Sequence, residues 1–203
     1  MTITRVTRLD ATRQLIAALH DEPVIASLGH PAYDLFAAGD RPSNFYTWGS
    51  MGLASSIGLG LAMARPSLRV FVLDGDGSLL MNLGSLATIG WTHPRNLVVI
   101  VWDNGEYGTT GGQQTATAHG ADLEAAARAM GITATATVTT ADAFDAAVAR
   151  SRAEPGPWLI VAKVAESAPT VKPPLDYVLI KRRFMDAIGN PESAVSEGNG
   201  GTT

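Results

Sequence analysis

The chain has 203 residues, of which 46% are hydrophobic, so it is long enough to bury the core of one domain but not of two. Its formal charge of −4 and its pI near 5.5, with no cluster of lysine and arginine, argue against a nucleic-acid-binding surface. Cysteine is absent, which excludes disulfides, thiolate metal sites, iron–sulfur clusters and cysteine nucleophiles and suits a cytoplasmic protein.

The first part of the chain predicts short helices and strands in alternation. Residues 7–21 predict an amphipathic helix, whose apolar run is too short for a secretion signal. A buried strand is predicted at 24–28 and a second helix at 32–38, followed by a loop at 43–48 that carries three aromatic residues. The uncharged stretch Ser43–Ala64 is 22 residues long, but its polar residues favour a buried helix over a membrane span.

The helix predicted in the later part of that stretch has a nearly smooth face. Ser56, Gly60 and Ala64 lie four positions apart, so their small side chains share one side of the helix. Another element is therefore expected to pack closely there, and either the sheet or a partner subunit would fit.

Two apolar runs of the middle part predict buried parallel strands, at 70–73 and 97–102, joined by a crossover helix at 79–90. A long polar loop at 105–120 follows and is expected to be a functional lid or disordered. The remaining predicted elements are a helix from its cap Asp122 to Met130, a strand at 134–138, a helix at 142–152 and a strand at 158–162. This alternation predicts an α/β fold with an open, mostly parallel sheet flanked by helices, as one domain over 1–189 with a disordered tail at 190–203.

The two middle strands both end in oxygen-rich segments. The first is followed by Asp74-Gly75-Asp76-Gly77-Ser78 and the second by Asp103-Asn104-Gly105-Glu106. Carboxylate, amide and free carbonyl oxygens suit Mg²⁺. The glycines let backbone N–H groups approach an anion, and a helix opened at Ser78 would favour one. The sequence therefore predicts a metal-bridged diphosphate site, although Gly75-Asp76-Gly77 taken alone would be read as a turn.

The spacing of the two segments resembles the signature of thiamine diphosphate enzymes, because Asn104 follows Asp76 by 28 positions. Residues 45–90 and 103–115 are also similar to the corresponding parts of sulfopyruvate decarboxylase β subunits and phosphonopyruvate decarboxylases. In that family the motif usually ends in Asn-Asn, where this chain has Asp103-Asn104.

The resemblance implies site residues one by one. Asp76, Asn104 and the backbone carbonyl of Glu106 would hold Mg²⁺. Met51 would lie as an apolar wedge between the two rings of the bent cofactor, and the Gly49 carbonyl would accept a hydrogen bond from the amine of the cofactor's pyrimidine. Without the resemblance, Met51 would be interpreted as a residue that fills the core. The full set implied to bind thiamine diphosphate is Gly49, Ser50, Met51, Gly75, Asp76, Gly77, Ser78, Asn104, Glu106 and Tyr107.

The resemblance also implies an activity and a partner. The chain would be the β-type subunit of a two-subunit decarboxylase that acts on a small 2-oxo acid, sulfopyruvate first and phosphonopyruvate second. Such enzymes also need a pyrimidine-binding domain with a glutamate, and no room exists for it here, so a separate α subunit is implied. Neither nucleic acid nor a membrane is expected as a partner.

Two histidines are candidate catalytic groups. His30 follows a predicted strand and could shuttle a proton, although a lone histidine in a turn is as often a cap. His119 closes the long loop and is a second candidate donor. The family usually has Arg-Glu-Leu where this chain has Tyr33-Asp34-Leu35, which weakens the case for a sulfonate or phosphonate tail. A carboligase related to acetolactate synthase and a non-catalytic, magnesium–nucleotide-binding subunit are the alternatives.

Overall fold

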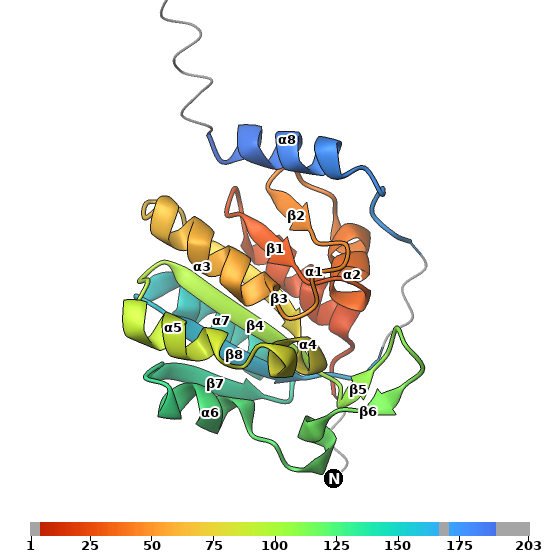
Figure 1. Ribbon diagram of the computed structural model, residues 1–203, viewed down its shortest axis with the longest axis vertical. Helices are drawn as coiled ribbons and strands as arrows, with labels where there is room; N and C mark the ends of the chain where they lie inside the picture. The colour runs from red at the N-terminus through yellow and green to blue at the C-terminus, as the bar shows by residue number, and fades with distance from the viewer. Residues whose placement is uncertain (1–4, 167–170, 190–203) are drawn as a thin grey trace, which may run out of the picture.

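A computed structural model describes residues 5–166 and 171–189. Its centre is a six-stranded parallel sheet in the order β2-β1-β3-β4-β8-β7, with a separate antiparallel hairpin, β5-β6 (Figure 1). The strands are β1 (Val24–Ala26), β2 (Asn44–Tyr46), β3 (Val70–Gly75), β4 (Leu97–Asp103), β5 (Glu106–Tyr107), β6 (Gln113–Gln114), β7 (Ala134–Val138) and β8 (Trp158–Lys163). The predicted α/β class with an open, parallel sheet is confirmed.

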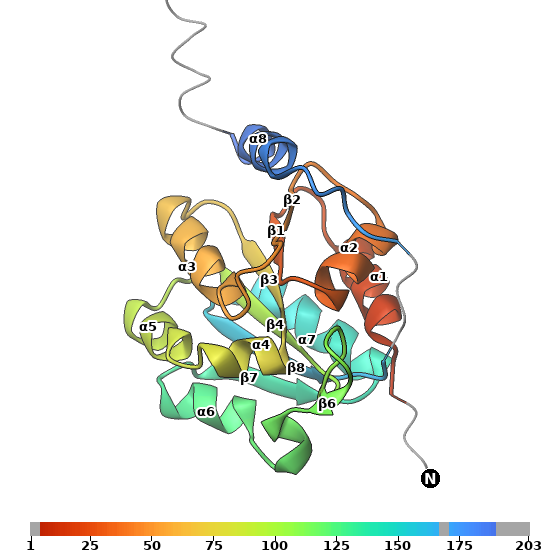
Figure 2. The ribbon, with the colours of Figure 1, turned by 45° about the vertical axis from the view of Figure 1, so that its right-hand side comes forward.

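The helices cover both faces of the sheet, as Figure 2 shows from the side. They are α1 (Arg8–Ala18), α2 (His30–Ala38), α3 (Ala54–Ala64), α4 (Asp76–Met81), α5 (Ser85–Thr92), α6 (Leu123–Ala129), α7 (Ala141–Ala153) and α8 (Tyr177–Ala187), with a 3₁₀ turn, η1, at Ala116–His119. Helices α1, α2 and α7 share one buried cluster with the sheet, and α3 to α6 share the other. Their apolar sides therefore complete a three-layer core.

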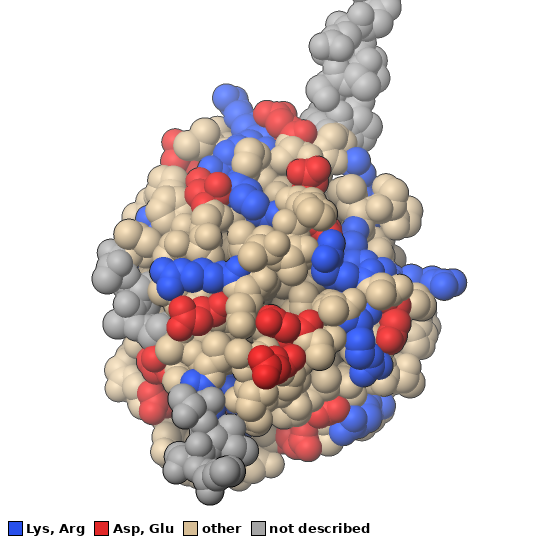
Figure 3. Space-filling view, turned by 180° about the vertical axis from the view of Figure 1, so that it is seen from behind, with Lys and Arg blue, Asp and Glu red and all other residues tan. Residues whose placement is uncertain are grey.

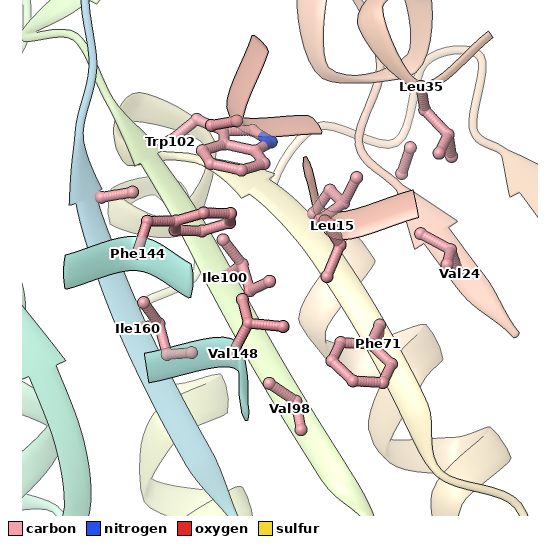
Figure 4. Close-up of a cluster of buried hydrophobic side chains, with 14 of the residues drawn as sticks. Leu15, Val24, Leu35, Phe71, Val98, Ile100, Trp102, Phe144, Val148 and Ile160 are labelled. Carbon is pink, nitrogen blue, oxygen red and sulfur yellow. The ribbon is translucent and has the colours of Figure 1, made fainter. Parts of the chain in front are cut away.

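The middle strands are buried on both faces because helices cover both sides of the sheet. Every residue of β4 is buried, and β3 is buried up to Asp74. In the first cluster the Trp102 indole lies 5.4 Å, between ring centroids, from Phe144 of α7 (Figure 4). These continuous apolar runs are the pattern of a parallel sheet and hold its carboxyl ends in register.

The structure divides the uncharged stretch 43–64 into a strand, a turn and an 11-residue helix, α3. No helix among the described residues is long and apolar enough to cross a membrane. The loop predicted at 43–48 is wrong in part, because Asn44–Tyr46 pairs with β1 as the edge strand β2. The single crossover helix predicted at 79–90 is likewise two helices, α4 and α5.

The smooth face of α3 does not pack on the sheet. Ser56, Gly60 and Ala64 are exposed, and nothing lies within 4 Å of the position that a Cβ on Gly60 would occupy. The close approach to the sheet is made by Gly58, where a Cβ would lie 2.2 Å from Val72 Cγ2. Of the two uses predicted for the smooth face, packing on the sheet is therefore wrong.

Helix α8 was not expected from the sequence and lies beside the edge strand β2 (Figure 1). The rings of Phe184 and Phe45 are 5.2 Å apart between centroids, and Arg183 forms an ion pair with Asp40. The predicted tail, 190–203, lies outside the described residues, and the extent of one domain over 1–189 stays a prediction. Seen from behind, acidic and basic side chains of the described residues are interspersed over the surface (Figure 3).

Candidate functional site

The candidate site lies where β1, β3 and β4 end. From β1 the chain crosses to β2 on one side and then returns to β3 on the other, so the strand order reverses between β1 and β3. Open α/β sheets bind ligands at such a reversal, beyond the carboxyl ends of the strands. The segments that follow β1 and β3 are in contact here, because the hydroxyls of Ser27, just after β1, and Ser78, in α4, are 3.0 Å apart.

A hollow of about 100 Å³, the strand-end hollow, opens at this place. Nine of the twelve residues predicted for the site line it: His30, Met51, Gly75, Asp76, Gly77, Ser78, Asn104, Glu106 and Tyr107. The structure therefore brings together three strand ends, a turn and a loop that are far apart along the chain.

Asp76 is the buried acid of the strand-end hollow. It is the first residue of α4 and only 2% exposed, and its Oδ2 accepts hydrogen bonds from the hydroxyls of Thr115 and Thr117. Burial raises the pKa of Asp76 above its usual range, and the negative charge of Asp103 acts in the same direction, whereas the two hydroxyls act against them. A bound divalent cation would favour the ionised carboxylate.

Asn104 follows β4 and presents an amide to the same hollow. Its Oδ1 accepts a hydrogen bond from the backbone N–H of Glu106 at 3.2 Å, and its Nδ2 donates to Oε2 of Glu166. The side chain of Glu106 is exposed to solvent. That the backbone carbonyl of Glu106 holds the metal stays a prediction.

The turn that carries Met51 is anchored to α4. Gly52 donates its N–H to Ser78 Oγ at 2.9 Å, and Asn82 Nδ2 donates to the Gly52 carbonyl at 3.0 Å. Ser50 has a positive φ of 56°, which is rare for a residue with a side chain, and its neighbours Gly49 and Gly52 are also left-handed. Met51 lines the strand-end hollow, whereas Gly49 and Ser50 are exposed beside it.

Ser78 does not open a helix, as the sequence suggested. Helix α4 begins at Asp76, Gly75 is its N-cap, and Ser78 uses its hydroxyl to tie the turn at Gly52 to the end of β1. The predicted helix start at Ser78 is therefore wrong by two residues, whereas an anion site at the N-terminus of this helix stays a prediction, and Ser78 does line the hollow.

The β5-β6 hairpin covers the strand-end hollow, and glycines allow its close approach. A Cβ on Gly77 would lie 2.3 Å from the Tyr107 ring, and one on Gly29 would lie 2.8 Å from Thr109 Cγ2. A Cβ on Gly108 would lie 3.0 Å from the His30 ring. The long loop is therefore a docked cover in this structure, which agrees with the predicted lid.

His30 belongs to a network of charged groups. Its Nδ1 lies 2.7 Å from Glu166 Oε1, and Arg8 of α1 binds both Glu166 and Asp34. Burial raises the pKa of Glu166, but the hydrogen bonds and charge of Arg8, with smaller effects of Asn104 and His30, outweigh it and hold that pKa below its usual value. His119 is exposed at the end of η1 and does not line the hollow.

Sequence reasoning missed several residues that shape the site. Ser27 and Glu166 could have been found, because each follows a buried strand, β1 and β8, at the same edge of the sheet. Arg8 carries no such signal, because it comes from the first helix and reaches the hollow only through the packing of α1 on α2. Thr115 and Thr117 stand in the long loop, whose course the sequence does not specify.

The donor set fits a magnesium-bound diphosphate. Asp76, Asn104 and the backbone carbonyl of Glu106 offer hard oxygen donors, and the three residues line one hollow. Beside them the Cβ position on Gly75 has no neighbour nearer than 3.9 Å, so a phosphate group can approach that backbone. No cluster of three or more His, Cys, Asp and Glu occurs among the described residues, so a site built from such side chains alone is not formed there.

Comparison with known proteins identifies the family of the chain. The family described as "Thiamine pyrophosphate enzyme, C-terminal TPP binding domain" matches residues 32–162. Sulfopyruvate decarboxylase subunit beta of Methanocaldococcus jannaschii is 40% identical over 89% of this chain and 96% of its own length. Phosphonopyruvate decarboxylase of Streptomyces viridochromogenes is 38% identical over 95% of this chain but only 44% of its own length.

One solved structure supports the fold. A Mycobacterium smegmatis protein described as a thiamin diphosphate-dependent enzyme superimposes with a TM-score of 0.70 over 80% of this chain and 32% of its own, at 24% identity. The family match over residues 32–162 and the identity to the decarboxylases show that the chain belongs to the thiamine pyrophosphate enzymes and carries their C-terminal, TPP-binding domain.

Proposed function

We propose that this chain is the β-type subunit of a two-subunit, thiamine diphosphate-dependent decarboxylase whose substrate is sulfopyruvate, with phosphonopyruvate as the second candidate. The observation that carries the proposal is the meeting of Asp76, Asn104 and Glu106 with Met51 in one hollow. The substrate is supported by the names of the relatives, two of which are 40% and 41% identical over nearly their full length.

A partner chain is supported by the lengths of the relatives. Two sulfopyruvate decarboxylase subunits named beta match over 96% and 98% of their own length and 89% and 90% of this chain, whereas the Streptomyces viridochromogenes phosphonopyruvate decarboxylase has more than half of its length outside the match. The separate α subunit would supply what the longer enzyme carries in one chain. The exposed smooth face of α3 is available for it.

The residues of this chain bind and orient the reactants. Asp76, Asn104 and the Glu106 carbonyl would hold Mg²⁺, Gly75 and Gly77 would face the diphosphate, and the hairpin would exclude water. When bound, thiamine diphosphate supplies the electron sink for the electrons released with CO₂.

His30 is the group of this chain best placed to hold a proton. Its Nδ1 is engaged by Glu166, which leaves Nε2 for the reacting atoms. His30→Gln should lower kcat by about 10²-fold. An unchanged kcat would remove His30 from the reaction.

The test is co-purification with the product of the neighbouring reading frame, followed by CO₂ release from sulfopyruvate, phosphonopyruvate and pyruvate with thiamine diphosphate and Mg²⁺. Release should need both chains and should disappear in Asp76→Ala. A carboligase would instead consume an added acceptor aldehyde, and a nucleotide-binding subunit would bind nucleotide without thiamine diphosphate. If no oxo acid is turned over, the proposal fails.

A further inference from the structure

Asn104 is held from outside the strand-end hollow by Glu166, a residue of the segment that follows β8. The amide of Asn104 makes two hydrogen bonds: Nδ2 donates to Glu166 Oε2, and Oδ1 accepts from the backbone N–H of Glu106. An amide oxygen has two lone pairs, so Oδ1 keeps one of them for a cation.

The carboxylate of Glu166 favours one orientation of the Asn104 amide over the other. A carboxylate only accepts hydrogen bonds, so it binds the NH₂ end and repels the oxygen end. If the amide of Asn104 turned over, its oxygen would face the carboxylate and its N–H groups would face the cation. A glutamine at position 166 could donate as well as accept, so the part of this preference that comes from Glu166 would be lost and only the Glu106 N–H would still favour the oxygen end.

Glu166 is itself fixed in place. Arg8 Nη1 donates to Oε2 of Glu166 at 2.9 Å and Arg8 Nη2 to Oε1 at 3.3 Å, which is the forked geometry that guanidinium groups favour. Arg8 Nε donates to Oδ2 of Asp34 at 2.6 Å. Arg8 is 3% exposed and Asp34 is fully buried, so the far end of the network is set in the core between α1 and α2.

We propose that Glu166 is a positioning residue that keeps the amide oxygen of Asn104 turned toward Mg²⁺, and that Arg8 holds Glu166 for this task. The inference rests on the proposed function of the site and deepens it. Groups that orient a metal ligand without touching the metal contribute roughly 10–100-fold to metal affinity. Glu166 therefore acts on magnesium binding through Asn104.

The variant that tests the inference is Glu166→Gln in the complex of both chains. The magnesium concentration that half-saturates thiamine diphosphate binding, followed by tryptophan fluorescence, should rise about ten-fold. Glu166→Asp keeps an acceptor-only group and should give a smaller rise. Glu154→Gln makes the same chemical change in the exposed ion pair with Arg150 and should leave the value unchanged.

A second measurement separates this inference from the proposed function. In the full chain without cofactor or metal, the side-chain NH₂ signals of Asn104 in ¹H–¹⁵N spectra should exchange slowly with solvent in the wild type and quickly in Glu166→Gln. If both proteins half-saturate at the same magnesium concentration and their Asn104 signals exchange alike, the inference is overturned. If the wild-type complex releases no CO₂, the proposed function fails, while the exchange rates still decide whether Glu166 orients Asn104.

Discussion

Asp103 is paired with Lys163: the lysine ammonium, at the end of β8, binds Oδ2 of an aspartate that is only 3% exposed. The family usually has asparagine at this position, which needs no counter-charge. The pair explains how this chain can carry a buried carboxylate beside its candidate metal ligands. The Thr117 hydroxyl lies 2.8 Å from the other oxygen of Asp103, Oδ1, and 2.8 Å from Asp76 Oδ2, so its one proton is available to either carboxylate.

We expect the two members of this pair to respond differently to mutation. Lys163→Met leaves Asp103 charged and buried, and should lower the free energy of unfolding by about 2 kcal/mol, less than the ~3–5 kcal/mol of a fully buried pair because Lys163 reaches solvent. Asp103→Asn leaves a lysine that can turn to water and should cost under about 1 kcal/mol. The double variant should regain most of the loss in urea unfolding. A double variant as unstable as Lys163→Met would contradict this account.

The docking of the hairpin should depend on Gly77. Gly77→Ala places a Cβ against the Tyr107 ring and should push the hairpin away, at a cost of about 1–3 kcal/mol in the free energy of unfolding. Hydrogen exchange at residues 106–114 should become faster. The matched change Gly75→Ala meets no atom within 3.8 Å and should leave that exchange as it is. Equal exchange in both variants would show that the hairpin does not rest on Gly77.

Substitutions at the two glycines of α3, Gly58 and Gly60, should distinguish an effect on the stability of this chain from an effect on its association with the α subunit. Gly58→Ala collides with Val72 and should destabilise the free chain, whereas Gly60→Ala points into open space and should stabilise it by roughly 0.5–1 kcal/mol through helix propensity. Gly60→Leu should then weaken association with the α subunit in analytical ultracentrifugation. Wild-type association of Gly60→Leu would place the partner elsewhere.

Glu124 should make the stability of the chain depend on pH on the acid side. Burial raises the pKa of its carboxyl, but hydrogen bonds from Thr137 and Thr135, with Arg128, outweigh burial and hold that pKa below its usual value. A carboxyl whose pKa is lowered by folding contributes stability above its unfolded pKa and loses it as the pH falls through the folded pKa.

Wild type should therefore exceed Glu124→Gln in stability at neutral pH, and the difference should shrink as the pH falls below about 4. Urea unfolding of both proteins at several pH values measures this difference in the free energy of unfolding. Thr137→Val removes one donor and should reduce the slope. A difference that is constant with pH would refute the assignment.

The sequence predicts those residues of the site that lie in or next to a short stretch with a clear pattern of apolar and polar residues. Two uniform apolar runs ending in acidic and amide residues were enough to place Asp76 and Asn104 at neighbouring strand ends, because parallel strands end at one edge. The edge strand β2 was missed because it has only three residues, one of them Asn44, and pairs with β1 alone. Such a strand has no pattern that separates it from a loop.

The network behind the site could not be predicted for a different reason. Arg8 and Glu166 are separated by almost the whole chain, and they meet because α1 packs on α2 and the segment after β8 returns to Val6 and Arg8. Such contacts depend on tertiary packing and leave no short-range signal. The same holds for the covering hairpin, whose strands of two residues each are too short to show alternation.

The place of β8 in the sheet has a consequence for folding. Strand β8, the last strand of the described residues, lies between β4 and β7, so β7 has no described strand to pair with until residues 158–163 have been synthesised. Pairing across such sequence separations is slow, because the entropy of loop closure must be overcome first. A nascent chain that ends before β8 presents β4 as an open edge whose residues 97–102 are all apolar, which is the kind of surface that chaperones shield during synthesis.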